Sequence, residues 1–237
     1  MNAPADSFEE EAVNPILTVC LVSGLSLAAP QTKPVLTVVV HDLAGIDPAV
    51  RNIAKVQAIR VLNKAGVELQ WIDANSVEDP RLLSTMKRYG TVVITRQALN
   101  GLRNTDAMGF ASVRSGPDPR AYVFYGMVNA FAENFSRSKS DLGIILGHAI
   151  VHELGHLVIP GNAHGAGAGI MSPDWGHLEW VAALQGALLF VPDHARMLRE
   201  GLQPNCGHLV EGIPCVLESR KSEPEYWHGR GSLEPRR

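Results

Sequence analysis

Hydrophobic and polar positions follow two different periods along this chain. Short apolar runs rich in β-branched residues and bounded by turn residues predict strands, whereas apolar positions spaced three and four apart predict helices. The predicted strands cover residues 35–41, 67–72, 91–95, 108–113 and 121–125, with a turn at 115–119 before the last of them. The predicted helices cover residues 48–64, 80–88 and 178–201, and another begins near Ser140.

Cap residues and prolines give further information on two of these helices. Asp47 and Pro48 form the cap and first turn of the helix at 48–64, and Gly66 follows its end. Its predicted inward positions are Val50, Ile53, Val56, Ile59 and Leu62. The helix at 178–201 is predicted as one amphipathic segment that Pro192 could kink or divide. Its predicted inward positions are Leu178, Val181, Leu184, Leu188 and Val191.

The helix that begins near Ser140 is apolar around most of its circumference, as expected of a helix buried against a sheet. It nevertheless contains His152, Glu153 and His156. Two histidines four apart lie on one face of a helix, so both imidazoles can reach one zinc ion, while the glutamate points at the metal's open position. The pattern predicts metal-assisted hydrolysis, with a zinc-activated water and Glu153 as general base.

A zinc site needs a third protein ligand. The helix is predicted to end at Pro160 and Gly161, after which the chain can turn back towards the metal. His164 follows in the glycine-rich segment HGAGAG, and is the predicted third ligand. The competitors are Asp174, His177 and Glu179. His148 lies one turn before His152 and is predicted to be a core histidine or a support for the ligands.

These residues resemble the metzincin clan of zinc endopeptidases. That family carries His-Glu-x-x-His-x-x-Gly-x-x-His, followed by a tight turn with a methionine beneath the metal. The corresponding residues here are His152, Glu153, His156, Gly161 and His164. Met171 follows within the sequence Ile-Met-Ser-Pro, which resembles the methionine turn of matrixin-like members. Two extra residues separate His156 from Gly161, so the family's third-ligand position falls on Asn162. The chain is also similar to uncharacterised bacterial metzincin-like proteins with this spacing.

The resemblance implies a zincin-like α+β fold over residues 35–202. Its expected parts are a twisted, mostly parallel five-stranded sheet with an antiparallel edge strand, a backing helix, the active-site helix and a C-terminal helix after the methionine turn. An exposed strand edge can pair with an extended peptide. Gly109, Phe110, Ala111 and Ser112 are therefore the candidate substrate-binding residues.

Two alternative functions stay open. In gluzincin-like peptidases a glutamate on a later helix completes the zinc site, and Glu179 is the candidate for that role. The second alternative is a zinc-bearing module that binds peptides or has a structural role without cleaving them.

Composition and the chain termini add further expectations. The 237 residues are 46% hydrophobic and carry a formal charge of −3 without a basic stripe, so nucleic acid is not an expected partner. Residues 1–29 include an uncharged run that fits a signal peptide, which predicts export, although the preceding stretch is acidic and a buried strand is the alternative. That run is too short to span a bilayer comfortably. Residues 203–237 are predicted to be an irregular tail, in which Cys206 and Cys215 could form a local disulfide.

Overall fold

The computed structural model describes residues 32–77, 90–98, 107–112, 119–161, 164 and 169–203. Several predictions lie outside the described residues. They are the signal peptide, the helix at 80–88, most of the turn at 115–119, and the tail beyond residue 203 with both of its cysteines. Export and the disulfide therefore stay predictions.

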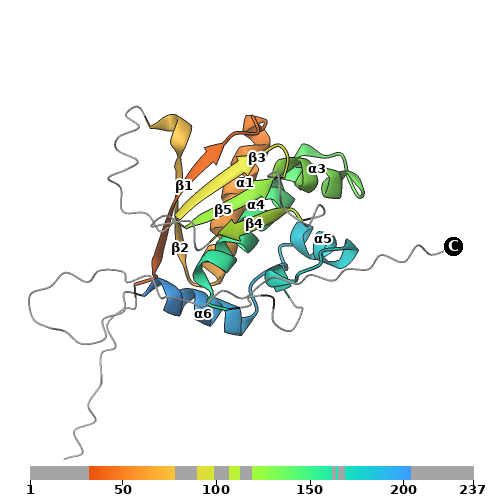
Figure 1. Cartoon of the computed structure of the whole chain (residues 1–237). Coiled ribbons are helices and arrows are strands. Elements are labelled where there is room, and N and C mark those ends of the chain that lie inside the picture. The colour runs from red at the N-terminus through yellow and green to blue at the C-terminus, as the bar shows by residue number, and fades with distance from the viewer. Residues whose placement is uncertain are drawn as a thin grey trace, which may run out of the picture. The chain divides into compact units, whose positions relative to one another are not determined.

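Five strands form one sheet in the order β2-β1-β3-β5-β4 (Figure 1). They are β1 (Val35–Asp42), β2 (Glu68–Asp73), β3 (Gly90–Thr95), β4 (Gly109–Ser112) and β5 (Arg120–Phe124). The first three and β5 are parallel to their neighbours, whereas β4 pairs with β5 in the antiparallel direction. This confirms the predicted α+β architecture, including the antiparallel strand at the edge.

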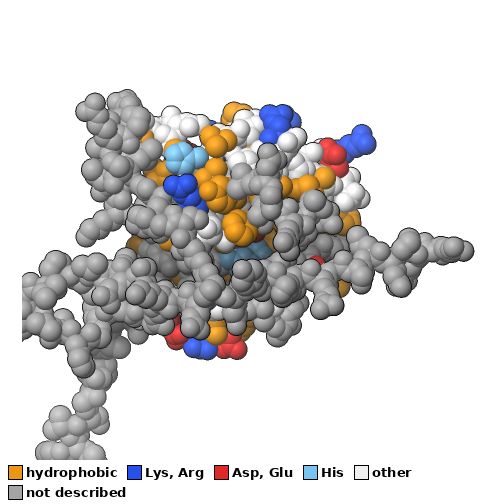
Figure 2. Space-filling model, in the orientation of Figure 1, with side chains coloured by type: hydrophobic (Ala, Val, Ile, Leu, Met, Phe, Trp, Pro, Cys, Tyr) orange, Lys and Arg blue, Asp and Glu red, His pale blue; other side chains and the backbone are white. Residues whose placement is uncertain are grey.

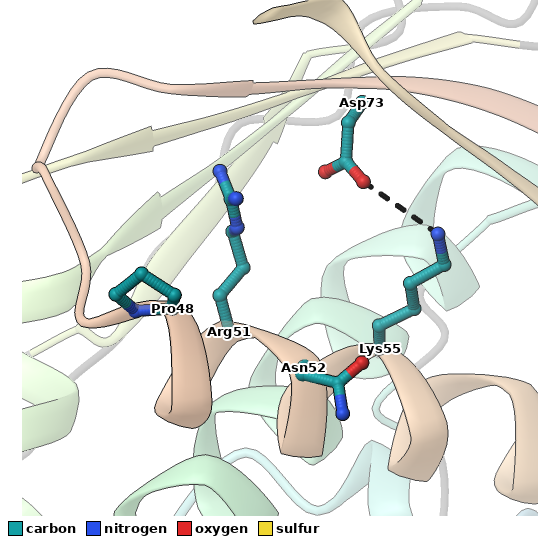
Figure 3. A pocket seen from close by; sticks show the side chains of 5 residues that line it. All are labelled: Pro48, Arg51, Asn52, Lys55 and Asp73. Atoms are coloured by element: carbon teal, nitrogen blue, oxygen red, sulfur yellow. Dashed lines mark ion pairs between the residues drawn. The ribbon is translucent and has the colours of Figure 1, made fainter. Parts of the chain in front are cut away.

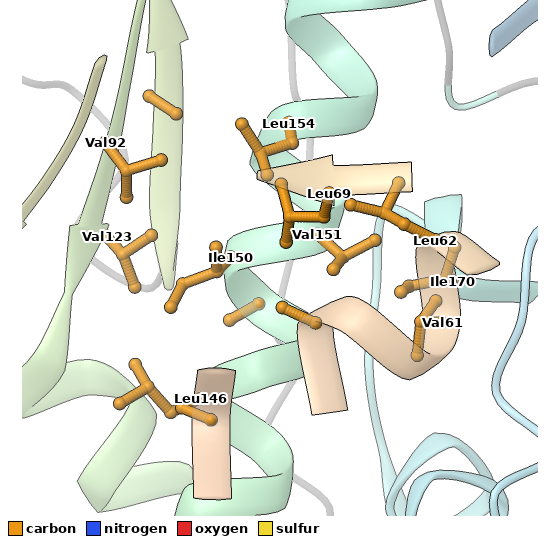
Figure 4. Packing of buried hydrophobic residues seen from close by; sticks show 14 of the residues in the cluster. Val61, Leu62, Leu69, Val92, Val123, Leu146, Ile150, Val151, Leu154 and Ile170 are labelled. Carbon is orange, nitrogen blue, oxygen red and sulfur yellow. The ribbon is translucent and has the colours of Figure 1, made fainter. Parts of the chain in front are cut away.

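Two long helices, α1 (Pro48–Lys64) and α4 (Lys139–Val158), pack against each other and against the sheet. Figure 4 shows the hydrophobic core that they share with the strands. Its members include Val61 and Leu62 of α1, Leu146, Ile150, Val151 and Leu154 of α4, and Leu69, Val92 and Val123 of the strands. Complete burial of one such side chain is worth about 1.5–3 kcal/mol, so this core is what holds α4 in place.

Glycines let the two helices approach closely. A Cβ atom added to Gly143 would lie 2.7 Å from Cβ of Ile53, and one added to Gly147 would lie 2.6 Å from the carbonyl oxygen of Ala54. Real side chains do not tolerate such distances, so both positions require a residue without a side chain. The backbone of α4 is thereby fixed against α1 one to three turns before His152.

Helix α1 begins and ends as predicted, but its buried stripe differs. The Asp47 carboxylate accepts a hydrogen bond from the backbone N–H of Ala49 at 2.9 Å, and Gly66 has a φ of +80° just beyond the end. The side chain of Val56, predicted to point inward, is 54% exposed. Small residues take the places closest to α4, because a close helix contact selects alanine over larger side chains. The buried positions are Val50, Ala54, Ala58, Val61 and Leu62.

Two helices near the site differ from the prediction. Helix α3 (Tyr125–Glu133) follows β5 directly and was not predicted, so β5 does not lead straight into α4. The predicted helix at 178–201 is two helices, α5 (His177–Leu184) and α6 (Pro192–Leu202). The helical conformation ends after α5, where Gly186 has a φ of +74°. It begins again at Pro192, because proline is tolerated in the first turn of a helix. The inward prediction is wrong for Leu178, which is 78% exposed, and for Leu184, which is 37% exposed.

Among the described residues, none of the helices combines the length and the apolar character needed to cross a membrane. In the space-filling view, hydrophobic side chains gather over the middle of the described surface, with charged side chains at the upper right and at the bottom (Figure 2). A small pocket of about 110 Å³ lies beside α1, where Lys55 Nζ and Asp73 Oδ2 are 3.5 Å apart (Figure 3). None of the candidate site residues lines this pocket.

Candidate metal centre

Helix α4 presents the first two histidines of the site. Its N-terminus is capped by the Ser138 hydroxyl, which accepts hydrogen bonds from two backbone N–H groups of the first turn. His152 and His156 are four positions apart, and their Nε2 atoms lie 3.1 Å apart on one face of the helix. The helix ends at Val158, two residues before Pro160, as predicted.

His164 completes a three-histidine group. Its Nε2 lies 3.4 Å from Nε2 of His152, and its ring lies 4.5 Å from the ring of His156, centre to centre. In a tetrahedral zinc site with bonds of 2.0–2.1 Å, two ligand nitrogens are about 3.3 Å apart. All three ligand atoms lie within 4.8 Å of one another. In the described part of the chain, this is the one cluster of three or more His, Cys, Asp or Glu residues that could hold a metal ion. Both the donor type and the spacing therefore fit Zn²⁺.

The structure places the competing ligands elsewhere. The Glu179 carboxylate accepts a hydrogen bond from the backbone N–H of Gly176 at 2.8 Å and so caps helix α5. The ring of His177 lies 5.7 Å from the ring of Phe135. Neither residue belongs to the three-histidine group, and neither does Asp174. The geometry therefore favours His164 over Glu179 as the third ligand.

The turn after the glycine-rich segment orients His152. Nδ1 of His152 lies 2.7 Å from the carbonyl oxygen of Ile170, so this nitrogen is the N–H donor and Nε2 presents its lone pair. The backbone N–H of Ile170 donates in turn to the carbonyl of Leu189 at 2.9 Å. The hydrogen bond from His152 to the Ile170 carbonyl could not be predicted from the sequence, because every residue type has a backbone carbonyl group.

Met171 lies in the short turn Gly169–Met171 and is 1% exposed. A Cβ atom added to Gly155 of α4 would meet the Met171 sulfur at 2.5 Å, so the methionine packs directly against this helix. Trp175, four residues further on, places its ring edge-on to that of His152, with 5.8 Å between the centres. Trp175 could not be singled out from the sequence, since it belongs to no motif or periodic pattern.

Burial keeps the histidines neutral. Desolvation lowers the pKa of His152 to about 4 and that of His156 to about 3, and it also lowers the pKa of His164. A neutral imidazole is the form that binds metal, so at pH 7 the group needs no deprotonation before it can coordinate an ion.

Glu153 follows His152 on helix α4 and is 6% exposed. Burial raises the pKa of its carboxyl to about 8, because the apolar surroundings disfavour the charged form. A group with a pKa near the working pH is suited to accepting and returning a proton.

His148 is completely buried on the same helix, one turn before His152. Its Nδ1 lies 2.7 Å from the carbonyl oxygen of Ile144, and desolvation lowers its pKa to about 4. It is not a member of the three-histidine group, which agrees with the expectation that it belongs to the core.

The four residues nominated for substrate binding form β4 at the edge of the sheet. Side chains alternate along a strand, so Gly109 and Ala111 face helix α4 whereas Phe110 and Ser112 face the other side. The ring of Phe110 is 42% exposed. The structure therefore places the nominated strand beside Glu153 of α4, the helix that also carries His152 and His156.

Comparison with known proteins finds a likeness among solved structures. No protein-family model matches the sequence, and the search of curated proteins finds no match. Among solved structures, the chain is similar to a zinc-dependent peptidase from Methanocorpusculum labreanum (strain Z). The two share 12% sequence identity with a TM-score of 0.49, over 68% of this chain and 99% of the other. Activity does not transfer at such distances.

Proposed function

We propose that this chain is a zinc-dependent hydrolase, and specifically a metalloendopeptidase whose catalytic domain covers residues 35–202. The observation that carries the proposal is the convergence of the ligand nitrogens of His152, His156 and His164, with Glu153 directly after His152 on the same helix. The order of these residues and the buried Met171 after them support a metzincin-like site with a longer loop before the third histidine.

The three histidines would hold the ion through neutral imidazoles. Bound Zn²⁺ supplies Lewis acidity, which makes a water molecule more acidic and a scissile carbonyl more electrophilic. Glu153 accepts a proton from the attacking water at a carboxylate oxygen and returns it to the nitrogen of the leaving amine. His152 is held in one tautomer by the Ile170 carbonyl, and Met171 contributes packing beneath the site.

The edge strand is suited to an extended peptide. The backbone N–H of Phe124 donates to the carbonyl of Met108 at 2.8 Å, so these residues form a hydrogen-bonded pair of the antiparallel ladder. Such pairs alternate with residues whose N–H and C=O groups point away from the neighbouring strand. Gly109 and Ala111 occupy those alternate positions, and no described strand pairs with that side of β4. A substrate could therefore add as a further strand beside Glu153.

A second candidate function has one observation in its favour. Glu153 is 6% exposed, so its carboxylate has little contact with solvent in this conformation. A zinc-bearing module that binds a peptide on β4 without cleaving it would need no accessible base.

Incubation of the zinc-loaded protein with a diverse peptide library, with and without a chelator, distinguishes the two candidates. An endopeptidase produces internal cleavages that disappear with the chelator and return with zinc. The matched control is Glu153→Gln, which should retain zinc and lose turnover. Absence of cleavage at every pH tested, by wild-type protein with one bound zinc, would leave the non-catalytic module as the function.

A further inference from the structure

The backbone of Gly109 lies so close to the side chain of Glu153 that a Cβ atom at position 109 would clash with it. A Cβ atom added to Gly109 would lie 2.5 Å from Oε1, 2.6 Å from Cγ and 2.7 Å from Cδ of Glu153. All three of its nearest neighbours are therefore atoms of the same glutamate. The φ angle of Gly109 is not in the left-handed region, so the backbone itself would accept alanine. A side chain at this position is therefore opposed by the Glu153 side chain and not by the backbone conformation.

The same residue belongs to the strand edge that faces away from β5. Gly109 pairs with Val123 at a position whose N–H and C=O groups point outward, towards the place of an added strand. The direction in which a side chain would leave its Cα atom is perpendicular to the sheet and points at the Glu153 side chain on α4. One residue therefore joins the peptide-binding edge to the general base.

We propose that Gly109 is a positioning residue, whose missing side chain lets the peptide-binding strand lie directly against Glu153. This inference rests on the proposed function, because it assigns Gly109 a role in the reaction attributed to Glu153. A methyl group at this position would push the carboxylate or the strand out of place. The nearest atoms belong to Glu153 and not to a histidine, so zinc binding should be spared.

The first test is the kinetics of Gly109→Ala. We expect zinc content to equal that of the wild type and kcat to fall about a hundredfold, the loss that a misplacement of about 1 Å can cause. Gly176→Ala is the matched control, because a Cβ atom there would meet only Oε2 of Glu179, at 3.8 Å. It should keep wild-type kcat. Wild-type kinetics in Gly109→Ala would overturn the proposal.

The second test is a double-mutant cycle on urea unfolding, which needs no activity. Glu153→Ala removes the three atoms that clash with a methyl group at position 109. Gly109→Ala should therefore lower the unfolding midpoint in the wild-type background and lower it by less than half as much in the Glu153→Ala background. Equal shifts in the two backgrounds would overturn the contact on which the proposal depends.

The two tests separate failure of this inference from failure of the proposed function. An active wild type with an equally active Gly109→Ala variant and additive stabilities overturns the role of Gly109 and leaves the peptidase in place. A zinc-loaded wild type that cleaves nothing overturns the peptidase and with it the catalytic part of the inference. Coupling in the cycle would then still establish the contact between Gly109 and Glu153.

Discussion

Replacing Glu153 with glutamine should stabilise the metal-free protein, and the gain should grow as the pH rises. Burial raises the pKa of the Glu153 carboxyl to about 8 in the folded chain, against 4.5 for an ordinary glutamate. Between these values the folded state holds a proton that the unfolded state has lost. The stability of the wild type therefore falls with rising pH across this window, whereas glutamine has no proton to lose.

The size of the effect follows from the two pKa values. Each factor of ten in proton affinity is worth about 1.4 kcal/mol, so the interval from 4.5 to about 8 corresponds to about 5 kcal/mol. This is an upper bound, because water penetration and relaxation around the carboxylate lower the cost of ionisation. A gain of about 2 kcal/mol between pH 5 and pH 9 is a conservative expectation.

The assay is urea unfolding of both proteins with a chelator present, at pH 5, 7 and 9. The neighbouring histidines titrate in both proteins, so their contribution cancels in the difference between them. A difference in unfolding free energy that stays constant within about 0.5 kcal/mol from pH 5 to pH 9 would refute the burial argument.

Three further predictions concern the surroundings of the site. Gly147→Val should lower the unfolding free energy by about 2–3 kcal/mol, because its Cβ would lie 2.6 Å from the Ala54 carbonyl oxygen, and unchanged urea unfolding would contradict it. Glu179→Ala should cost about 1 kcal/mol or less through the lost cap of α5 and should retain zinc, so loss of zinc in metal analysis would revive its role as a ligand. Met171→Leu should cost less than about 1.5 kcal/mol and keep both zinc and activity, whereas a loss of turnover at full zinc content would give the sulfur a chemical role.

The sheet and the two long helices could be predicted because their signals are local. Asp47 and Pro48 mark the start of α1, and apolar positions at helical spacing mark α4. Helix α3 was missed because Phe124, at its N-cap, offers no side-chain hydrogen bond, and the apolar run of β5 continues into it. The division between α5 and α6 depends on a positive φ at Gly186, one of several conformations open to a glycine.

In the candidate site, too, features set by neighbouring residues could be predicted from the sequence, whereas contacts between distant segments could not. The spacing of His152 and His156 follows from helix geometry, whereas His164 lies beyond the end of the helix and only the folded structure brings it to them. The contact of Gly109 with Glu153 joins an edge strand to a helix more than 40 residues away in the sequence. No spacing rule predicts such a pair, because it depends on how the sheet and α4 pack together.

The most direct test of the central claim is zinc K-edge X-ray absorption, together with metal analysis, on the wild type and on His164→Ala. We predict one zinc ion per chain with three imidazole nitrogens in the wild type, at about 2.0–2.1 Å. The variant should lose the ion or show one imidazole fewer. A His164→Ala variant with the zinc content and spectrum of the wild type would contradict the three-histidine centre.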